Sequence, residues 1–163
     1  MIYVALGANM PSPAGPPVVT LRQALAAMPR HRIDVVAVSP FYRSPAWPNP
    51  ADPPYVNAVA EVRTRLTPGE LLKALLAIEK TFGRVRKTRN EPRTLDLDLL
   101  DYGGLVSDVE QLMLPHPRMH ERAFVLRPLA DIAPAWRHPD TGEAIAVLLG
   151  NVGEAGLERL KDA

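Results

Sequence analysis

The amino-acid sequence predicts an α+β fold, in which helices pack on the faces of an antiparallel sheet. Some stretches alternate apolar and polar residues with a period of two, and others place apolar residues at helical spacing. Up to residue 101 the order of these stretches is β-α-β-β-α-β. That order is typical of the ferredoxin-like arrangement. No internal repeat or domain-sized linker interrupts it, so we expect a single domain over residues 1–163.

The first half of this order begins with a short apolar strand. Ile2–Leu6 is rich in β-favouring residues, and Gly7 and a proline-rich loop end it. Residues 18–28 carry apolar side chains at helical spacing, which predicts a helix. Residues 33–38, followed by Phe41 and Tyr42, are predicted to form one strand that Pro40 interrupts.

The second half of the order contains the clearest helix start in the chain. Residues 44–54 hold five prolines and are expected to form a loop, and residues 55–64 then alternate as a strand. Thr67, Pro68 and Glu70 fit the N-cap, N1 and N3 positions of a capping box. We expect that helix to end at Gly83 and the last core strand to cover residues 94–100.

Shorter elements are expected beyond the core. Leu105–Val106 is expected to add a strand, and residues 118–132 and 143–149 are expected to form short helices that cover the remaining surface.

Composition excludes several classes of protein. The formal net charge is only +1, so overall charge indicates neither a nucleic acid nor a membrane partner. The chain has no cysteine, which excludes disulfides and thiolate metal sites and favours a cytoplasmic protein. The first ten residues lack a basic n-region, and no run of about 18 apolar residues occurs, so we expect neither a secretory leader nor a membrane span.

Two aspartates in the last core strand form the first candidate site. Residues i and i+2 of a strand face the same side, so Asp96 and Asp98 share one face while Leu95, Leu97 and Leu99 anchor the other. The aspartates could form a solvated polar face, or they could hold hard cations such as Mg²⁺. The register breaks at Leu100, and we therefore expect Asp101 to be a turn residue.

The loop before this strand favours the metal interpretation. Residues 84–93 contain five basic side chains against the single acidic Glu91, a local charge of +4. Arginine forks beside a metal-binding carboxylate pair suit a Mg²⁺–polyphosphate complex. The chain has no P-loop or G-x-G-x-x-G turn, so side chains and metal would have to hold the phosphates. The neighbouring prolines disfavour an i, i+4 zinc pair of His116 and His120.

Several blocks of the chain resemble one family. "GRVRKTRNEPRTLDLDLLDYG" and "LPHPRMHERAFVLRPLADIAP" are similar to 6-hydroxymethyl-7,8-dihydropterin pyrophosphokinase of folate biosynthesis. "YVALGANM", "SPFYRSPAW", "PPYVNAV" and "LLAIEKTFGR" resemble its other blocks, in order. The resemblance implies an ATP-dependent diphosphotransferase. Such an enzyme transfers the β,γ-diphosphate of ATP to the 6-hydroxymethyl group of the reduced pterin and releases AMP.

The resemblance also implies roles for individual residues. Asp96 and Asp98 would hold two Mg²⁺ ions, and Arg84 and Arg93 would act with them in catalysis. The ATP contacts carried over by resemblance are Glu79, Arg86, Lys87, Arg89, His116 and Arg122. The pterin contacts carried over are Ser44, Pro45, Trp47, Tyr55, Asn57 and Phe124. The implied partners are these two small molecules, and we expect a monomer.

Some positions depart from the pattern of the family, and two alternatives stay open. The departures are Leu76, Asn90, Glu91, Gln111 and Pro117, which replace nucleotide contacts or a stacking residue of some members. One alternative is a relative that binds ATP or pterin without turnover. The other is an RNA-binding module of the same topology, although neither central strand carries the exposed aromatic run that such modules use.

Overall fold

A six-stranded antiparallel sheet forms the centre of the computed structural model, which describes residues 1–46, 50–83 and 94–161. Its strands are β1 (Ile2–Ala8), β2 (Asp34–Val38), β3 (Tyr42–Ser44), β4 (Tyr55–Arg63), β5 (Asp96–Tyr102) and β8 (Glu158–Arg159). They lie in the order β5-β1-β4-β3-β8, and β2 also pairs with β4. β2 and β3 therefore act as one interrupted strand beside β4, as the position of Pro40 predicts. The α+β class and the ferredoxin-like core are confirmed.

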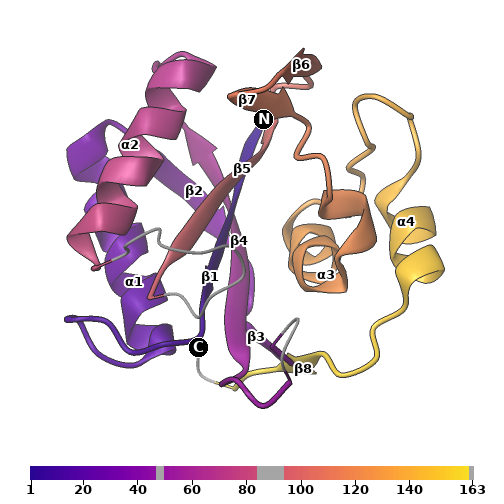
Figure 1. Ribbon diagram of the computed structural model, residues 1–163. Helices are drawn as coiled ribbons and strands as arrows, with labels where there is room; N and C mark the ends of the chain where they lie inside the picture. The colour runs from indigo at the N-terminus through magenta and orange to yellow at the C-terminus, as the bar shows by residue number, and fades with distance from the viewer. Residues whose placement is uncertain (47–49, 84–93, 162–163) are drawn as a thin grey trace.

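Helices cover both faces of this sheet (Figure 1). α1 (Pro17–Ala27) and α2 (Pro68–Thr81) lie on one face, and α3 (Ala123–Ile132) and α4 (Ile145–Val152) lie on the other. Short 3₁₀ turns, η1 (Met28–His31) and η2 (Met119–Glu121), follow α1 and precede α3. Among the described residues, no helix combines the length and the apolar character that crossing a membrane requires.

The alternation of the strands divides the buried side chains between two cores. Leu6 of β1, Ala58 of β4 and Leu97 of β5 pack on one face with α1 and α2. Val59 and Leu100 pack on the other face with α3 and α4. Leu95, Leu97 and Leu99 all belong to the first core, so the predicted apolar face of β5 is confirmed.

The capping box predicted for α2 is present. Thr67 N donates to Glu70 Oε1 over 2.9 Å, and Glu70 N donates to Thr67 Oγ1 over 3.3 Å. Gly83, which follows the helix, has φ +82°, a conformation that glycine adopts without strain. Both ends of α2 therefore form where local sequence predicts them, and α2 packs against β5.

Two predictions for the end of β5 and the segment after it are wrong. The strand after Gly104 begins at Ser107, not at Leu105, and forms a hairpin of β6 (Ser107–Val109) and β7 (Leu112–Leu114). Asp101 is a buried strand residue and not a turn residue. A bulge leaves Leu100 without a partner on β1, so Asp101 pairs with Tyr3. Asp101 Oδ2 accepts a 2.8 Å hydrogen bond from Trp136 Nε1.

Candidate functional site

One row of paired residues crosses three neighbouring strands of the sheet. Gly7 of β1 lies opposite Asp96 of β5 on one side and opposite Asn57 of β4 on the other. Two residues along β1, Ala5 lies between Asp98 and Val59 in the same way. The sheet therefore places the predicted metal ligands and the predicted pterin amide on either side of one strand, β1.

Small residues on β1 leave room above this row. A Cβ added at Gly7 would lie 3.3 Å from Asn57 Oδ1, closer than ordinary contact allows. Gly7 and Ala5 both line a cavity of about 430 Å³, together with Asp96, Asp98 and Asn57. A larger side chain at Gly7 would fill the space between the carboxylates and the amide.

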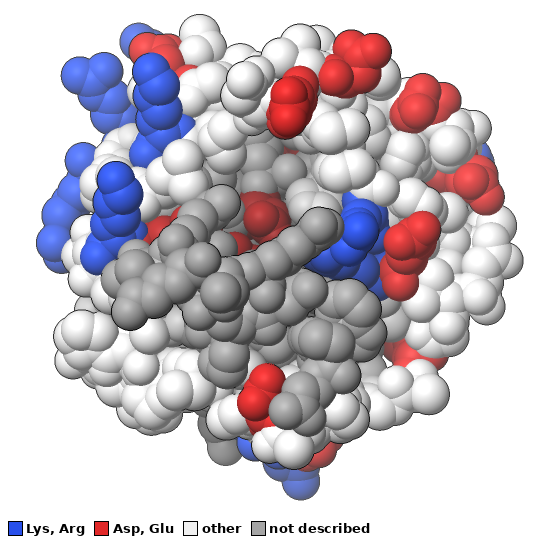
Figure 2. All heavy atoms as spheres, viewed as in Figure 1, with Lys and Arg blue, Asp and Glu red and all other residues white. Residues whose placement is uncertain are grey.

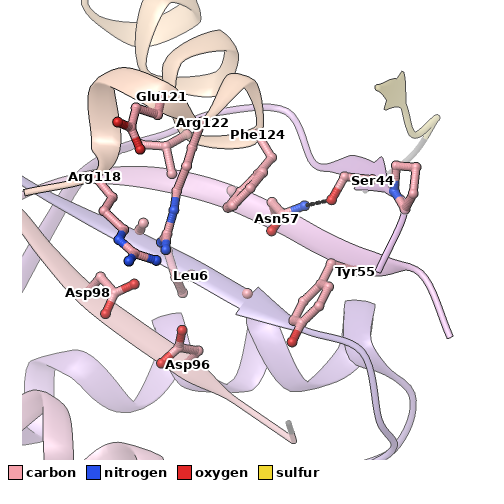
Figure 3. Close-up of a pocket in the computed structure, with 15 residues that line it drawn as sticks. Leu6, Ser44, Tyr55, Asn57, Asp96, Asp98, Arg118, Glu121, Arg122 and Phe124 are labelled. Carbon is pink, nitrogen blue, oxygen red and sulfur yellow. Dashed lines mark hydrogen bonds between the residues drawn. The ribbon is translucent and has the colours of Figure 1, made fainter. Parts of the chain in front are cut away.

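The opposite wall of the cavity comes from η2 and the start of α3. Arg118, Glu121, Arg122 and Phe124 all line it. The guanidinium groups of Arg118 and Arg122 point toward Asp98, while Phe124 lies over the Asn57 side of the cavity (Figure 3). The guanidinium of Arg122 is also 5.6 Å from the ring centroid of Phe124, within cation–π range. One end of the cavity is therefore charged and the other is aromatic and amide-lined.

The amide-lined end is held by side chains from two strands. Asn57 is buried, and its Nδ2 donates a 2.8 Å hydrogen bond to Ser44 Oγ. This bond fixes the orientation of the amide, as Figure 3 shows. Pro45 and Tyr55 complete this end of the cavity. The set offers hydrogen-bonding groups and aromatic surface to a flat polar ring.

His116 lies beside the charged end without lining the same cavity. Its Nε2 is 4.0 Å from Asp98 Oδ2, and its Nδ1 accepts a 3.2 Å hydrogen bond from Arg118 N. Burial, with help from the positive charges of Arg122 and Arg118, lowers the pKa of His116 to about 4, although the Asp96 carboxylate opposes the shift. At neutral pH the ring is uncharged, and with Nδ1 accepting, its proton is on Nε2.

Glu79 lies outside the cavity-lining set. It is 2% exposed on α2, and its Oε2 accepts a 2.7 Å hydrogen bond from Leu97 N. Leu97 is the residue between Asp96 and Asp98, so this carboxylate anchors the strand that carries the metal pair. The expectation of a nucleotide contact at Glu79 stays a prediction, and the anchoring role was not foreseen.

The structure brings most of the described candidates together. Eight of them line the cavity: Ser44, Pro45, Tyr55, Asn57, Asp96, Asp98, Arg122 and Phe124. Glu79 and His116 are described but do not line the cavity. The other six candidates lie outside the described residues, namely Trp47, Arg84, Arg86, Lys87, Arg89 and Arg93.

Sequence reasoning missed three of the residues that shape the cavity. Gly7, Arg118 and Glu121 line it, but none was singled out. Gly7 could have been found, because a glycine at the end of an apolar strand is typical of close backbone approach. Arg118 and Glu121 gave no comparable signal, because their positions depend on how η2 packs over the sheet.

The donor set fits magnesium better than a transition metal. Among residues 1–46, 50–83 and 94–161, no three His, Cys, Asp or Glu side chains are close enough to form a metal cage. Two carboxylates on one strand suit Mg²⁺, which takes one or two carboxylates and completes its shell with water and phosphate oxygens. Acidic side chains lie in a hollow near the centre of the face in Figure 2, with basic side chains beside it.

Comparison with known proteins supports the same assignment. Residues 3–134 match the model of the family described as 7,8-dihydro-6-hydroxymethylpterin-pyrophosphokinase (HPPK). The chain is 47% identical over 163 residues to 2-amino-4-hydroxy-6-hydroxymethyldihydropteridine pyrophosphokinase of Pseudomonas aeruginosa, covering 99% of this chain and 98% of that protein. It is 41% identical over 131 residues to the Bacillus subtilis protein of the same name, covering 80% of this chain and 76% of that protein.

Solved structures share the fold at much lower identity. A crystal structure of Plasmodium falciparum HPPK-DHPS matches 97% of this chain with a TM-score of 0.70 and 12% identity. An HPPK-DHPS structure solved in complex with substrates matches 98% with a TM-score of 0.72 and 12% identity. This chain spans 46% of the length of each of those two chains. With the family match over residues 3–134, the chain belongs to the 7,8-dihydro-6-hydroxymethylpterin-pyrophosphokinase family.

Proposed function

We propose that this protein transfers the β,γ-diphosphate of ATP to 6-hydroxymethyl-7,8-dihydropterin and releases AMP, a step of folate biosynthesis. The observation that carries the proposal is the two-ended cavity. A carboxylate pair flanked by guanidinium groups lies across β1 from a hydrogen-bonded amide and aromatic surface. The first end suits a metal–polyphosphate, and the second suits a planar heteroaromatic ring.

In this proposal the pterin ring binds at the end formed by Tyr55, Asn57 and Phe124. The hydrogen bond from Asn57 Nδ2 to Ser44 fixes the amide, and Asn57 Oδ1 would accept from the ring edge. The aromatic side chains stack on or border the ring. The hydroxymethyl group then extends toward Asp96 and Asp98, because the two ends of the cavity adjoin across Gly7.

The triphosphate would occupy the charged end. Asp96 and Asp98 would hold two Mg²⁺ ions, which when bound neutralise phosphate charge and orient the two reacting oxygens. Arg118 and Arg122 donate to phosphate oxygens, and the uncharged His116 donates through its Nε2–H. The hydroxyl oxygen loses its proton to water and forms a bond to the β-phosphorus, while the bond from that phosphorus to the α–β bridging oxygen breaks and AMP leaves. Arg84 and Arg93 are proposed to approach the transferred group, with Arg86, Lys87 and Arg89 on ATP.

The architecture disfavours the RNA-binding alternative. RNA-recognition modules of this topology stack bases on an open sheet face. Here α1 and α2 cover one face and α3 and α4 the other, and both faces bury an apolar core. Among the described residues, the candidate site occupies the cavity between the sheet and η2–α3. We propose a cytoplasmic monomer that acts on small molecules.

AMP formation from ATP tests the proposal. We expect AMP only when both hydroxymethyldihydropterin and Mg²⁺ are present. Asp98→Asn should abolish this activity without unfolding the protein, and the matched variant Asp108→Asn, an exposed aspartate of the β6–β7 hairpin, should keep it. If wild-type protein forms no pterin-dependent AMP, the proposed function is wrong. If it binds both ligands without forming AMP, it is the relative without turnover.

A further inference from the structure

The end of the chain packs behind one wall of the cavity. Residues 135–161 lie beyond the region that matches the family model, and they contain α4 and β8. β8 extends the sheet as the strand next to β3 (Figure 1). β3 ends at Ser44, and Ser44 and Pro45 line the cavity. The chain end therefore borders the wall on which the pterin would bind.

Several independent contacts hold this chain end in place. Arg159 pairs with Tyr42, and Glu158 pairs with Arg43. Leu160 N donates a 2.8 Å hydrogen bond to Phe41 O, and the Leu160 side chain packs against the larger core. The position of the backbone at residues 158–160 is therefore tied to β3.

Gly156 makes the contact that reaches the cavity wall. A Cβ added at Gly156 would lie 3.2 Å from Pro45 Cγ and 3.4 Å from Pro45 Cδ. Gly156 also has φ +80°, so glycine meets two requirements here: a left-handed backbone and direct contact with the proline ring. Pro45 thus contacts Gly156 and lines the cavity at the same time.

We propose that Gly156 is a positioning residue for substrate binding, which acts by seating Pro45 at the amide-lined end of the cavity. This inference rests on the proposed function for the identity of the ring that binds there. A Cβ at Gly156 requires the contact with Pro45 to open by a few tenths of an ångström. Ser44, the residue before Pro45, holds the amide of Asn57. The width of this end and the direction of the amide are therefore set in part by the last residues of the chain.

Two glycine variants isolate the contact from the backbone strain. Gly156→Ala and Gly142→Ala both place a Cβ on a positive-φ residue, at φ +80° and +75°. No atom lies within 4 Å of the Cβ built at Gly142, whereas Pro45 meets the one at Gly156. We expect Gly156→Ala to raise the KM and the Kd for hydroxymethyldihydropterin about three- to tenfold, because displacements of a few tenths of an ångström at a binding site are costly. The KM for ATP and the kcat should stay within about twofold of wild type, and Gly142→Ala should change none of them.

A double mutant completes the test. In a Pro45→Ala background, Gly156→Ala should add no further change in pterin KM, because the ring that the Cβ meets is gone. If the alanine variants do not fold, Gly156→Asn and Gly142→Asn replace them, because asparagine tolerates positive φ. Equal effects at Gly156 and Gly142, or an undiminished Gly156 effect in the Pro45→Ala background, would overturn the proposal.

A further measurement separates this inference from the proposed function. Wild type, Gly156→Ala, Pro45→Ala and the double variant are unfolded in urea. Their free energies of unfolding give the coupling energy between Gly156 and Pro45 without any substrate. A non-zero coupling is expected from the contact, and zero coupling overturns the inference. Failure of the proposed function would appear earlier and differently, as absence of pterin-dependent AMP formation by wild-type protein.

Discussion

Replacing Glu79 with alanine should destabilise the fold and disturb the site, even though Glu79 does not line the cavity. The carboxylate is 2% exposed and accepts a 2.7 Å hydrogen bond from Leu97 N. Among the described strands β5 lies at the edge of the sheet and pairs only with β1, so the Leu97 amide depends on a side chain for its partner. Alanine removes that partner.

The expected loss follows from the chemistry of the contact. A hydrogen bond to a charged group contributes about 1.5–3 kcal/mol, and a buried N–H left without a partner costs about 1–3 kcal/mol. These are overlapping descriptions of one loss, so we expect Glu79→Ala to lower the free energy of unfolding by about 1.5–3 kcal/mol. For a chain of this size, that corresponds to a fall in Tm of about 3–12 °C.

Glu79→Gln separates the hydrogen bond from the charge. The glutamine amide oxygen can accept the same N–H, and a neutral bond is about half as strong, so this variant should lose only about 1–1.5 kcal/mol. Lys73→Ala, an exposed change on the same helix, is the control and should stay within about 0.5 kcal/mol of wild type.

The assay combines urea unfolding with steady-state kinetics. We expect Glu79→Ala to lower kcat as well as stability, because Leu97 lies between Asp96 and Asp98 on the strand. The reasoning is refuted if Glu79→Ala unfolds like wild type, or if Glu79→Gln loses as much stability as Glu79→Ala. A Glu79→Gln variant with wild-type stability but a much higher KM for ATP would instead favour the nucleotide contact that the family resemblance implies.

Three further predictions concern other parts of the structure. Arg118→Gln should raise the KM for ATP about tenfold without changing the KM for pterin, because Arg118 lines the charged end of the cavity, and the exposed Arg65→Gln should change neither constant. Trp136→Phe should lower the free energy of unfolding by about 1.5–3 kcal/mol in urea, because it removes the 2.8 Å hydrogen bond to Asp101; a loss below about 0.5 kcal/mol would contradict this. Burial, with His120 nearby, lowers the pKa of His138, so stability should fall as the pH drops below about 6.5, where the unfolded state takes up the proton first. The loss of stability should continue down to the lowered pKa of His138 in the folded state. It should be shallower in His138→Gln, and an unchanged dependence of stability on pH in that variant would contradict this assignment.

Local sequence was sufficient for most of the fold because local chemistry decides those features. Thr67 and Glu70 form the predicted capping box, and the alternation of Leu95, Leu97 and Leu99 places them in one core. The predictions failed where packing decides the outcome. Asp101 was expected in a turn, but the bulge at Leu100 turns it toward Trp136, a residue 35 positions away.

In the candidate site, too, some features follow from local sequence and others from tertiary structure. The spacing of Asp96 and Asp98 is enough to place both carboxylates on one face, because a strand has a period of two. The pairing of Gly7 with both Asp96 and Asn57 is not visible in the sequence, because it depends on the register of three strands. The roles of Arg118 and Glu79 likewise depend on how η2 and α2 pack on the sheet.

The sequence by itself therefore determined the α+β class, the order of the core elements and the face that carries the metal ligands. Each of these follows from periodicities and caps that extend over only a few residues. Tertiary structure alone decided which distant residues meet at the site: Asp98 and Arg118 line one cavity, Asn57 bonds to Ser44, and Gly156 lies behind Pro45. Those neighbours are set by strand register and by helix packing, and both depend on contacts across the whole chain.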